Sequence, residues 1–255
     1  MNKGEVIMYN KFTNHYYLSR KNKGSSRLLN GDVVGIVFFV NDAVSSWTEE
    51  AKKSYMTQHN KAMRRIMSDA EGLNVYLRIR IASAEISVPL ECTYSNPYNW
   101  AVRAINQYGK NSVMEYQNYY KDKYKCDEAP IFFVFNKKAR SFASTASKFY
   151  PYTDEFSVIF RDDNGRFSAF SVEHELMHQF GAMDLYFPDE VNKSATKHLP
   201  KSIMNDGYEI DSLTRFLIGW TAQIDDKAGA FLNDTEHITN EMVESYTREQ
   251  WKKWS

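Results

Sequence analysis

The sequence predicts a mixed α/β fold: a five-stranded, mostly parallel sheet with long helices, followed by a smaller and mainly helical C-terminal part. Residues 32–40 (DVVGIVFFV) are a continuous apolar run between turn residues, as expected of a strand buried on both faces. Residues 47–70 carry apolar side chains at helical spacing, and Gly72 provides a stop. Residues 73–81 (LNVYLRIRI) alternate between apolar and polar, which indicates a second strand. Strand, helix and strand in this order predict a right-handed crossover between parallel strands.

Three further strands complete the predicted sheet. Residues 130–135 (PIFFVF) and 155–160 (EFSVIF) are apolar runs typical of buried strands, whereas residues 140–146 (RSFASTA) form a weaker strand suited to a sheet edge. The strong turn at residues 162–165 (DDNG) precedes a helix that starts near Ser168. This helix has apolar residues at i, i+4 spacing on the face that would contact the sheet.

We expect one domain over residues 31–255, preceded by an N-terminal extension, residues 1–30. The polar stretch at residues 19–26 is the expected flexible boundary between them. Within the domain, an upper part ends at residue 181 and contains a helical insertion at about residues 83–128, and a lower part covers residues 182–255. No internal repeat or low-complexity tract suggests a different division.

The chain carries 32 Lys and Arg against 32 Asp and Glu, so its formal net charge is zero. No overall field favours nucleic acid or an anionic membrane surface, and we expect neither nucleic-acid binding nor membrane insertion. Because residues 1–30 show no signal peptide, we expect a cytoplasmic protein, or one secreted as a mature or non-classically exported form. We expect a monomer. Cys92 and Cys126 are too few for a disulfide framework; we expect free thiols, with a single disulfide as the alternative.

The chemistry of the chain is concentrated in the run His174-Glu175-Leu176-Met177-His178. Four residues are just over one helical turn, so both imidazoles project from the same side and can bind one zinc ion. Glu175 lies about 100° around the helix, where it can reach a water on that ion and accept its proton. These residues predict a metal-dependent hydrolase.

The residues that follow sharpen this prediction. Gly181 can adopt a positive φ and end the helix, so that the chain reverses and brings Asp184 back to the metal as a third ligand. One alternative stays open at this point. Asp184 could be an ordinary solvated acid, in which case His198 in the following segment is the leading substitute ligand.

This pattern resembles the metzincin clan of zinc endopeptidases, whose motif is H-E-x-x-H-x-x-G-x-x-H/D, and its aspartate is similar to that of snapalysin-type members. The resemblance covers roughly residues 32–220. It implies a zinc metallopeptidase catalytic domain and a methionine-containing turn under the metal, for which Met204 is the candidate. Asp211 then caps a helix whose apolar positions extend to Trp220, and a helix after the methionine turn is also what the clan shows.

The same resemblance suggests how a substrate would be bound. An extended polypeptide would pair with the edge strand through Ser141, Phe142, Ala143 and Ser144, the alternative being an edge merely covered by a loop. Relatives often carry a tyrosine two residues after the turn methionine, whereas Asp206 occupies that position here. Tyr208 and Tyr186 are therefore both candidates for transition-state support, with a packing role as the alternative. The insertion has no counterpart in the clan and could cover part of the cleft.

The sequence thus favours a zinc-dependent metalloendopeptidase with one catalytic Zn²⁺, ligands His174, His178 and Asp184, and Glu175 as the base. A second hypothesis keeps the same site for a non-peptide amide or another small substrate in a closed pocket. A third treats zinc as a staple in a non-catalytic interaction protein; three protein ligands argue against it, because structural sites are usually closed by four.

Overall fold

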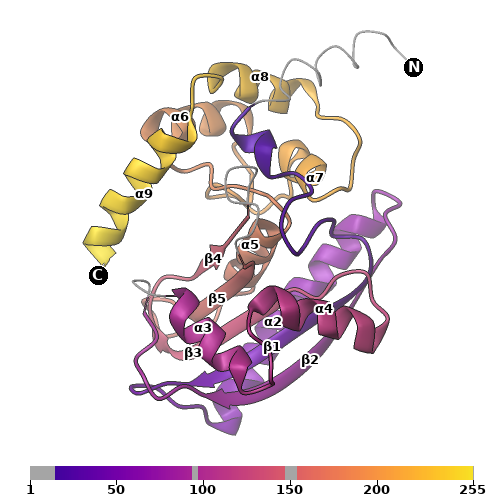
Figure 1. Cartoon of the computed structure of the whole chain (residues 1–255). Coiled ribbons are helices and arrows are strands. Elements are labelled where there is room, and N and C mark those ends of the chain that lie inside the picture. Colours follow the sequence, from indigo (N-terminus) through magenta and orange to yellow (C-terminus); the bar gives the residue numbers. More distant parts are fainter. Residues whose placement is uncertain (1–14, 94–96, 147–153, 255) are drawn as a thin grey trace.

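A five-stranded sheet lies at the centre of the computed structural model, which describes residues 15–93, 97–146 and 154–254. The strands follow the order β2-β1-β3-β5-β4 (Figure 1). Their bounds are β1 Gly31–Asn41, β2 Leu77–Ser87, β3 Ile131–Lys138, β4 Phe142–Ser144 and β5 Phe156–Arg161. All neighbours pair in parallel except β4, which runs antiparallel to β5. The predicted fold class, a mixed α/β fold with a mostly parallel five-stranded sheet, is confirmed.

Helices cover both faces of the sheet and create two separate apolar cores. On one face lie α2 (Glu49–Glu71) and α5 (Ala169–Gln179), and on the other lie α3 (Pro97–Asn106) and α4 (Val113–Tyr124). The alternation of β1 explains this sandwich, because successive side chains of a strand point to opposite faces. The first core takes Val33, Val37 and Phe39, and the second takes Val34, Ile36, Phe38 and Val40.

The second strand differs from its prediction. It begins at Leu77 rather than residue 73, because the chain turns after α2 with Asn74 at φ 57°. It also continues to Ser87 and stays paired with β1 over that length, so the helical insertion begins later than the predicted residue 83. The two helices predicted within the insertion are α3 and α4.

Four helices follow α5 and gather on the side of it that faces away from the sheet (Figure 1). They are α6 Asp189–His198, α7 Ser212–Leu217, α8 Asp226–Asp234 and α9 Asn240–Trp254. Asp211 caps α7 as predicted, since its side chain accepts from the backbone of Leu213 and Thr214. The helix nevertheless ends before Trp220, because Gly219 adopts φ 88° and reverses the chain.

The polar stretch at residues 19–26, predicted to be a flexible boundary, is exposed in its middle and buried at both ends. Ser26 is 1% exposed, and its backbone N–H donates to the Glu155 carboxylate at 2.8 Å. Just beyond it, the Leu29 N–H donates to the Ile218 carbonyl at 2.9 Å, and the Leu29 carbonyl accepts from the Trp220 indole at 2.6 Å. The described N-terminal segment therefore joins the sheet to the C-terminal helices.

Two smaller expectations concern the thiols and the membrane. Cys92 is buried and Cys126 is partly buried, and both are free thiols, as expected. None of the helices in the described ranges combines the length and the apolar character that crossing a bilayer requires.

Candidate metal centre

The helix α5 is attached to the sheet at its C-terminal end. The Gln179 side chain bonds both backbone groups of Ile131, accepting from its N–H at 3.2 Å and donating to its carbonyl at 3.1 Å. It also donates to the Ser157 hydroxyl at 2.8 Å, and that hydroxyl donates to the Glu175 carbonyl at 2.8 Å. Because these partners are all buried, they hold the orientation of the helix on which the predicted ligands lie.

Backbone carbonyls determine the tautomers of the two histidines. His174 Nδ1 lies 2.8 Å from the Ile203 carbonyl, and His178 Nδ1 lies 2.9 Å from the Ala182 carbonyl. A carbonyl can only accept, so each Nδ1 carries the proton and donates. In the neutral imidazoles, Nε2 therefore presents a lone pair, which is the form that binds a metal.

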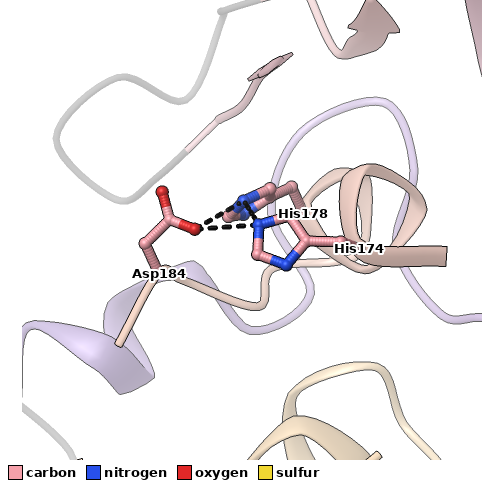
Figure 2. Close-up of side chains that lie close together, drawn as sticks. All are labelled: His174, His178 and Asp184. Carbon is pink, nitrogen blue, oxygen red and sulfur yellow. Dashed lines mark hydrogen bonds and ion pairs between the residues drawn. The ribbon is translucent and has the colours of Figure 1, made fainter. Parts of the chain in front are cut away.

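A sharp reversal after α5 brings the third group into place. Gly181 adopts φ 96°, and a Cβ at this position would lie 2.9 Å from the Arg20 carbonyl oxygen, so only glycine fits. Asp184 Oδ1 then lies 3.0 Å from His174 Nε2 and 3.1 Å from His178 Nε2. Figure 2 shows the two rings and the carboxylate pointing toward one another.

The three groups fit a cation by their donor chemistry. Within the described part of the chain they form the one cluster of His, Cys, Asp and Glu suited to a metal, with all ligand atoms within 4.8 Å of one another. The two Nε2 atoms are 3.2 Å apart. Two nitrogen lone pairs and a carboxylate oxygen at such distances repel one another unless a positive charge lies between them. A divalent cation with nitrogen and oxygen ligands supplies that charge.

The pKa values report the same electrostatics. Burial alone would lower the pKa of His174, but the hydrogen bond to Asp184 and the charges of Glu175 and Asp184 raise it to about 9. Burial would raise the pKa of Asp184, yet the two histidines hold it far below its usual range. Without a metal, a proton therefore occupies the cluster, and metal binding competes with protonation.

Glu175 lies beside this cluster. Its side chain is 5% exposed, and Oε2 is 4.0 Å from His178 Nε2. Oε2 is buried and has no hydrogen-bond partner among the described residues. Burial raises the pKa of the carboxyl group, against the opposing charges of His174 and His178. A buried carboxylate without a partner is costly to maintain, which is typical of a functional group.

The structure distinguishes between the two candidates for the third ligand, Asp184 and His198. His198, the alternative to Asp184, lies at the end of α6 and pairs with Asp234 of α8 at 2.8 Å, so it is not part of the cluster. Met204 is 1% exposed, and its carbonyl accepts from the Leu185 N–H at 2.7 Å. Because the preceding residue, Ile203, accepts from His174, the Met204 segment lies directly against the cluster.

The two candidate tyrosines also differ. The Tyr186 ring stacks on His174 with centroids 6.2 Å apart, and its hydroxyl accepts from Arg140 Nη2 at 2.5 Å. Tyr208 is 64% exposed and contacts Phe170 edge to face at 5.5 Å. Of the two candidates, Tyr186 is therefore the tyrosine that lies against the cluster of His174, His178 and Asp184.

A cavity of about 390 Å³ opens on the cluster and runs along β4. Glu175, His178 and Asp184 line it, together with all four predicted edge-strand residues: Ser141, Phe142, Ala143 and Ser144. Among the described strands, β4 pairs with β5 on one side only. A second cavity of about 620 Å³ adjoins the first, and the two share Arg140 and Ser141. Both cavities, referred to together as the groove, border the edge strand.

Other parts of the groove had not been predicted. The first cavity is also lined by Tyr16, by Arg20 and by four residues of α9: Asn240, Val243, Glu244 and Thr247. From the insertion, Pro97 and Tyr98 also line this cavity, and the Tyr98 hydroxyl is 2.7 Å from the Ser144 hydroxyl. The insertion thus borders the groove. No local pattern in the sequence pairs these segments with β4, because each is far from it along the chain.

Comparisons with known proteins add little to this picture. No protein-family model matches the chain, and no curated protein matches it. Among solved structures, the chain is similar to metalloproteinase-II from Bacteroides fragilis, with a TM-score of 0.39 and 10% sequence identity. The match covers 81% of this chain and 64% of that one, so this chain spans less than two thirds of its length. A similarity at this level defines no family, and the functional argument depends on the geometry of the site.

Proposed function

We propose that this chain is a zinc-dependent endopeptidase, in which His174, His178 and Asp184 hold the ion and Glu175 is the general base. The observation that carries the proposal is the convergence of two Nε2 atoms and one carboxylate oxygen beside Glu175, whose Oε2 has no hydrogen-bond partner in the described part of the chain. Three protein ligands leave a coordination position for water or substrate, as in catalytic zinc sites. A bound zinc ion would polarise the scissile carbonyl and lower the pKa of a water toward 7.

The part of Glu175 is to move a proton. Its raised pKa brings the carboxylate closer to the range in which a base works at neutral pH. In hydrolysis, the water oxygen bonds to the carbonyl carbon while Glu175 takes one water proton. Glu175 then gives that proton to the amide nitrogen as the C–N bond breaks, which leaves a carboxylic acid and an amine. Glu175 is restored to its starting state.

The groove supports a polypeptide as the substrate. An edge strand with one unpaired side can bind an extended peptide by main-chain hydrogen bonds, while pockets contact its side chains. The second cavity shares Arg140 and Ser141 with the first and contains none of the cluster residues, so the hollow beside β4 extends beyond the cluster. A small amide substrate would need a closed pocket. The open groove favours cleavage within a chain.

The decisive experiment combines metal analysis with digestion of a peptide library by the wild type and Glu175→Gln. We expect about one zinc per chain in both proteins and cleavage by the wild type alone. Glu173→Gln is the matched control on the same helix, because Glu173 is buried against Arg65 of α2, at 3.2 Å, and does not line the groove. We expect this control to keep its activity.

Three results would contradict the proposal. Cleavage by Glu175→Gln at the wild-type rate would show that Glu175 is not the general base. Iron in place of zinc would point to oxidative chemistry, because two histidines and a carboxylate also bind non-haem iron. Unfolding on metal removal, without cleavage of any peptide, would make the ion a structural staple.

A further inference from the structure

Arg140 lies where the two cavities of the groove meet. It lines the first cavity together with Glu175, His178 and Asp184. It also lines the second, whose other polar residues are Lys138, Ser141, Asp162, Asp163 and Ser171. A peptide bound in the first cavity with its scissile bond at the cluster would therefore share that cavity with this guanidinium.

Contacts with Tyr186 orient the guanidinium. Arg140 Nη2 donates to the Tyr186 hydroxyl at 2.5 Å, and its central carbon lies 5.2 Å from the centre of the same ring. That ring stacks on His174, so a ligand histidine, a tyrosine and an arginine form one continuous series of contacts. The positive charge of Arg140 also acts on Glu175, where it opposes the effect of burial on the pKa. Arg140 thus lines the same cavity as the proposed base, and Tyr186 holds its guanidinium there.

The two side chains differ in what they can contribute. The Tyr186 hydroxyl accepts from Arg140 Nη2, so its contribution is to hold the guanidinium in place. Arginine stays positively charged at any working pH, and its planar group carries five N–H donors. Peptide hydrolysis creates a negative charge on the carbonyl oxygen, and a fixed donor aimed at that charge is usually the largest single contribution to catalysis.

We propose that Arg140 is a catalytic residue that stabilises the carbonyl oxygen of the substrate as it becomes negative. The inference rests on the proposed function. As the water oxygen bonds to the carbonyl carbon, the π electron pair moves onto the carbonyl oxygen, and an N–H of Arg140 donates to it. When the C–N bond breaks, the pair returns to form the new carbonyl, and Arg140 keeps its proton throughout. Tyr186 positions the guanidinium.

The test compares Arg140→Gln and Arg140→Lys with the wild type, all zinc-loaded, on the best peptide from the library. We expect Arg140→Gln to lower kcat by about 100-fold and to leave KM within about threefold. Arg140→Lys retains the charge but not the planar fork, so we expect an intermediate kcat. Arg64→Gln, an exposed arginine of α2, is the matched control and keeps full activity.

A binding measurement separates the transition state from the ground state. A phosphinic peptide carries a tetrahedral anion in place of the attacked carbonyl, and calorimetry should show that Arg140→Gln weakens its binding by a factor similar to the loss in kcat. In a Glu175→Gln background, which leaves the substrate uncleaved, the same substitution should change the affinity for the substrate peptide by less than about threefold.

Several outcomes would overturn the inference. An unchanged kcat would remove Arg140 from the reaction while leaving the endopeptidase proposal intact. A raised KM with kcat retained, seen mainly with acidic peptides, would make Arg140 an anchor for a substrate side chain. Loss of zinc or a lower unfolding temperature in Arg140→Gln would make it structural. If the wild type cuts no peptide, the proposed function fails first, and the assignment of Arg140 fails with it.

Discussion

Two neighbouring helices on the same face of the sheet carry buried aromatic pairs at the same spacing, with opposite electrostatics. On α2, Tyr55 and His59 are four residues apart, and the Tyr55 hydroxyl is 2.8 Å from His59 Nδ1. On α5, His174 and His178 are four residues apart and their rings meet edge to face at 4.8 Å. Burial lowers the pKa of His59 to about 3, whereas the pKa of His174 is raised to about 9.

The difference comes from what surrounds each pair. His59 packs edge to face on Phe132, with centroids 4.8 Å apart, and its pKa shift is caused by burial alone. At α5, backbone carbonyls bind Nδ1 of both rings, and a carboxylate lies opposite Nε2. Helical spacing brings two rings together in both places. Only a facing carboxylate turns such a pair into a site for a cation, and Asp184 provides it.

The substitution Asp184→Asn removes the charge that distinguishes the α5 pair from the α2 pair, and we expect it to have the largest effect. The amide keeps the shape of the carboxylate but removes its charge. Substituting a residue that only hydrogen-bonds to a metal ligand typically lowers metal affinity by about 10–100-fold. Loss of a charged ligand itself should therefore lower the affinity by at least about 100-fold. In the metal-free variant the pKa of His174 should fall, because its hydrogen bond to a charged group is lost. Metal titration and histidine NMR measure both effects. Unchanged zinc affinity would show that Asp184 is not a ligand.

The other side of the comparison is tested by His59→Ala. We expect a loss of about 2–4 kcal/mol in the free energy of unfolding, because the substitution leaves a cavity and removes the partner of the Tyr55 hydroxyl. Zinc content should stay at the wild-type level. His237→Ala is the control, since its side chain is 55% exposed and paired with Glu190 at the surface. We expect a change below about 0.5 kcal/mol there. Loss of zinc in His59→Ala would contradict the comparison, because it would show that metal binding depends on the Tyr55–His59 pair.

Buried carboxylates show the same contrast, and the dependence of stability on pH reveals it. Glu155 accepts from the backbone of Ser26 and Ala146, and burial raises its pKa from 4.5 to about 8. Between these values the folded protein holds a proton that the unfolded chain has lost. Stability should therefore fall as pH rises from about 4.5 to 8, by at most about 1.4 kcal/mol per pH unit.

Glu155→Gln should remove that part of the pH dependence, whatever its effect on overall stability. Denaturant unfolding of the wild type and the variant at pH 5, 6.5 and 8 is the measurement. A difference between the two proteins that does not change with pH would contradict a raised pKa at Glu155. Asp184 has the opposite shift because histidines, which carry positive charge, are its partners instead of neutral N–H groups.

Local features explain which parts of the site were predictable. The shared side of His174 and His178 follows from 3.6 residues per turn, and the reversal at Gly181 follows from its freedom to adopt positive φ. Local features did not decide between Asp184 and His198, because the position of His198 depends on how α6 packs in the folded chain. The packing of α6 against α8 places His198 beside Asp234. The choice of Tyr186 over Tyr208 was equally open, because both follow the motif at distances that flexible geometry could accommodate.

The amino-acid sequence alone was sufficient for the class of the fold and for placing His174, Glu175 and His178 on one helix, because both depend on periodicity and short-range geometry. Its errors lay at the ends of elements, as at β2 and α7, where a single positive φ decides the boundary. Only the tertiary structure decided that α9 and β4 line one cavity and that Arg140 and Glu175 line it together. These contacts join segments distant in the sequence, and their formation depends on how the whole apolar core packs.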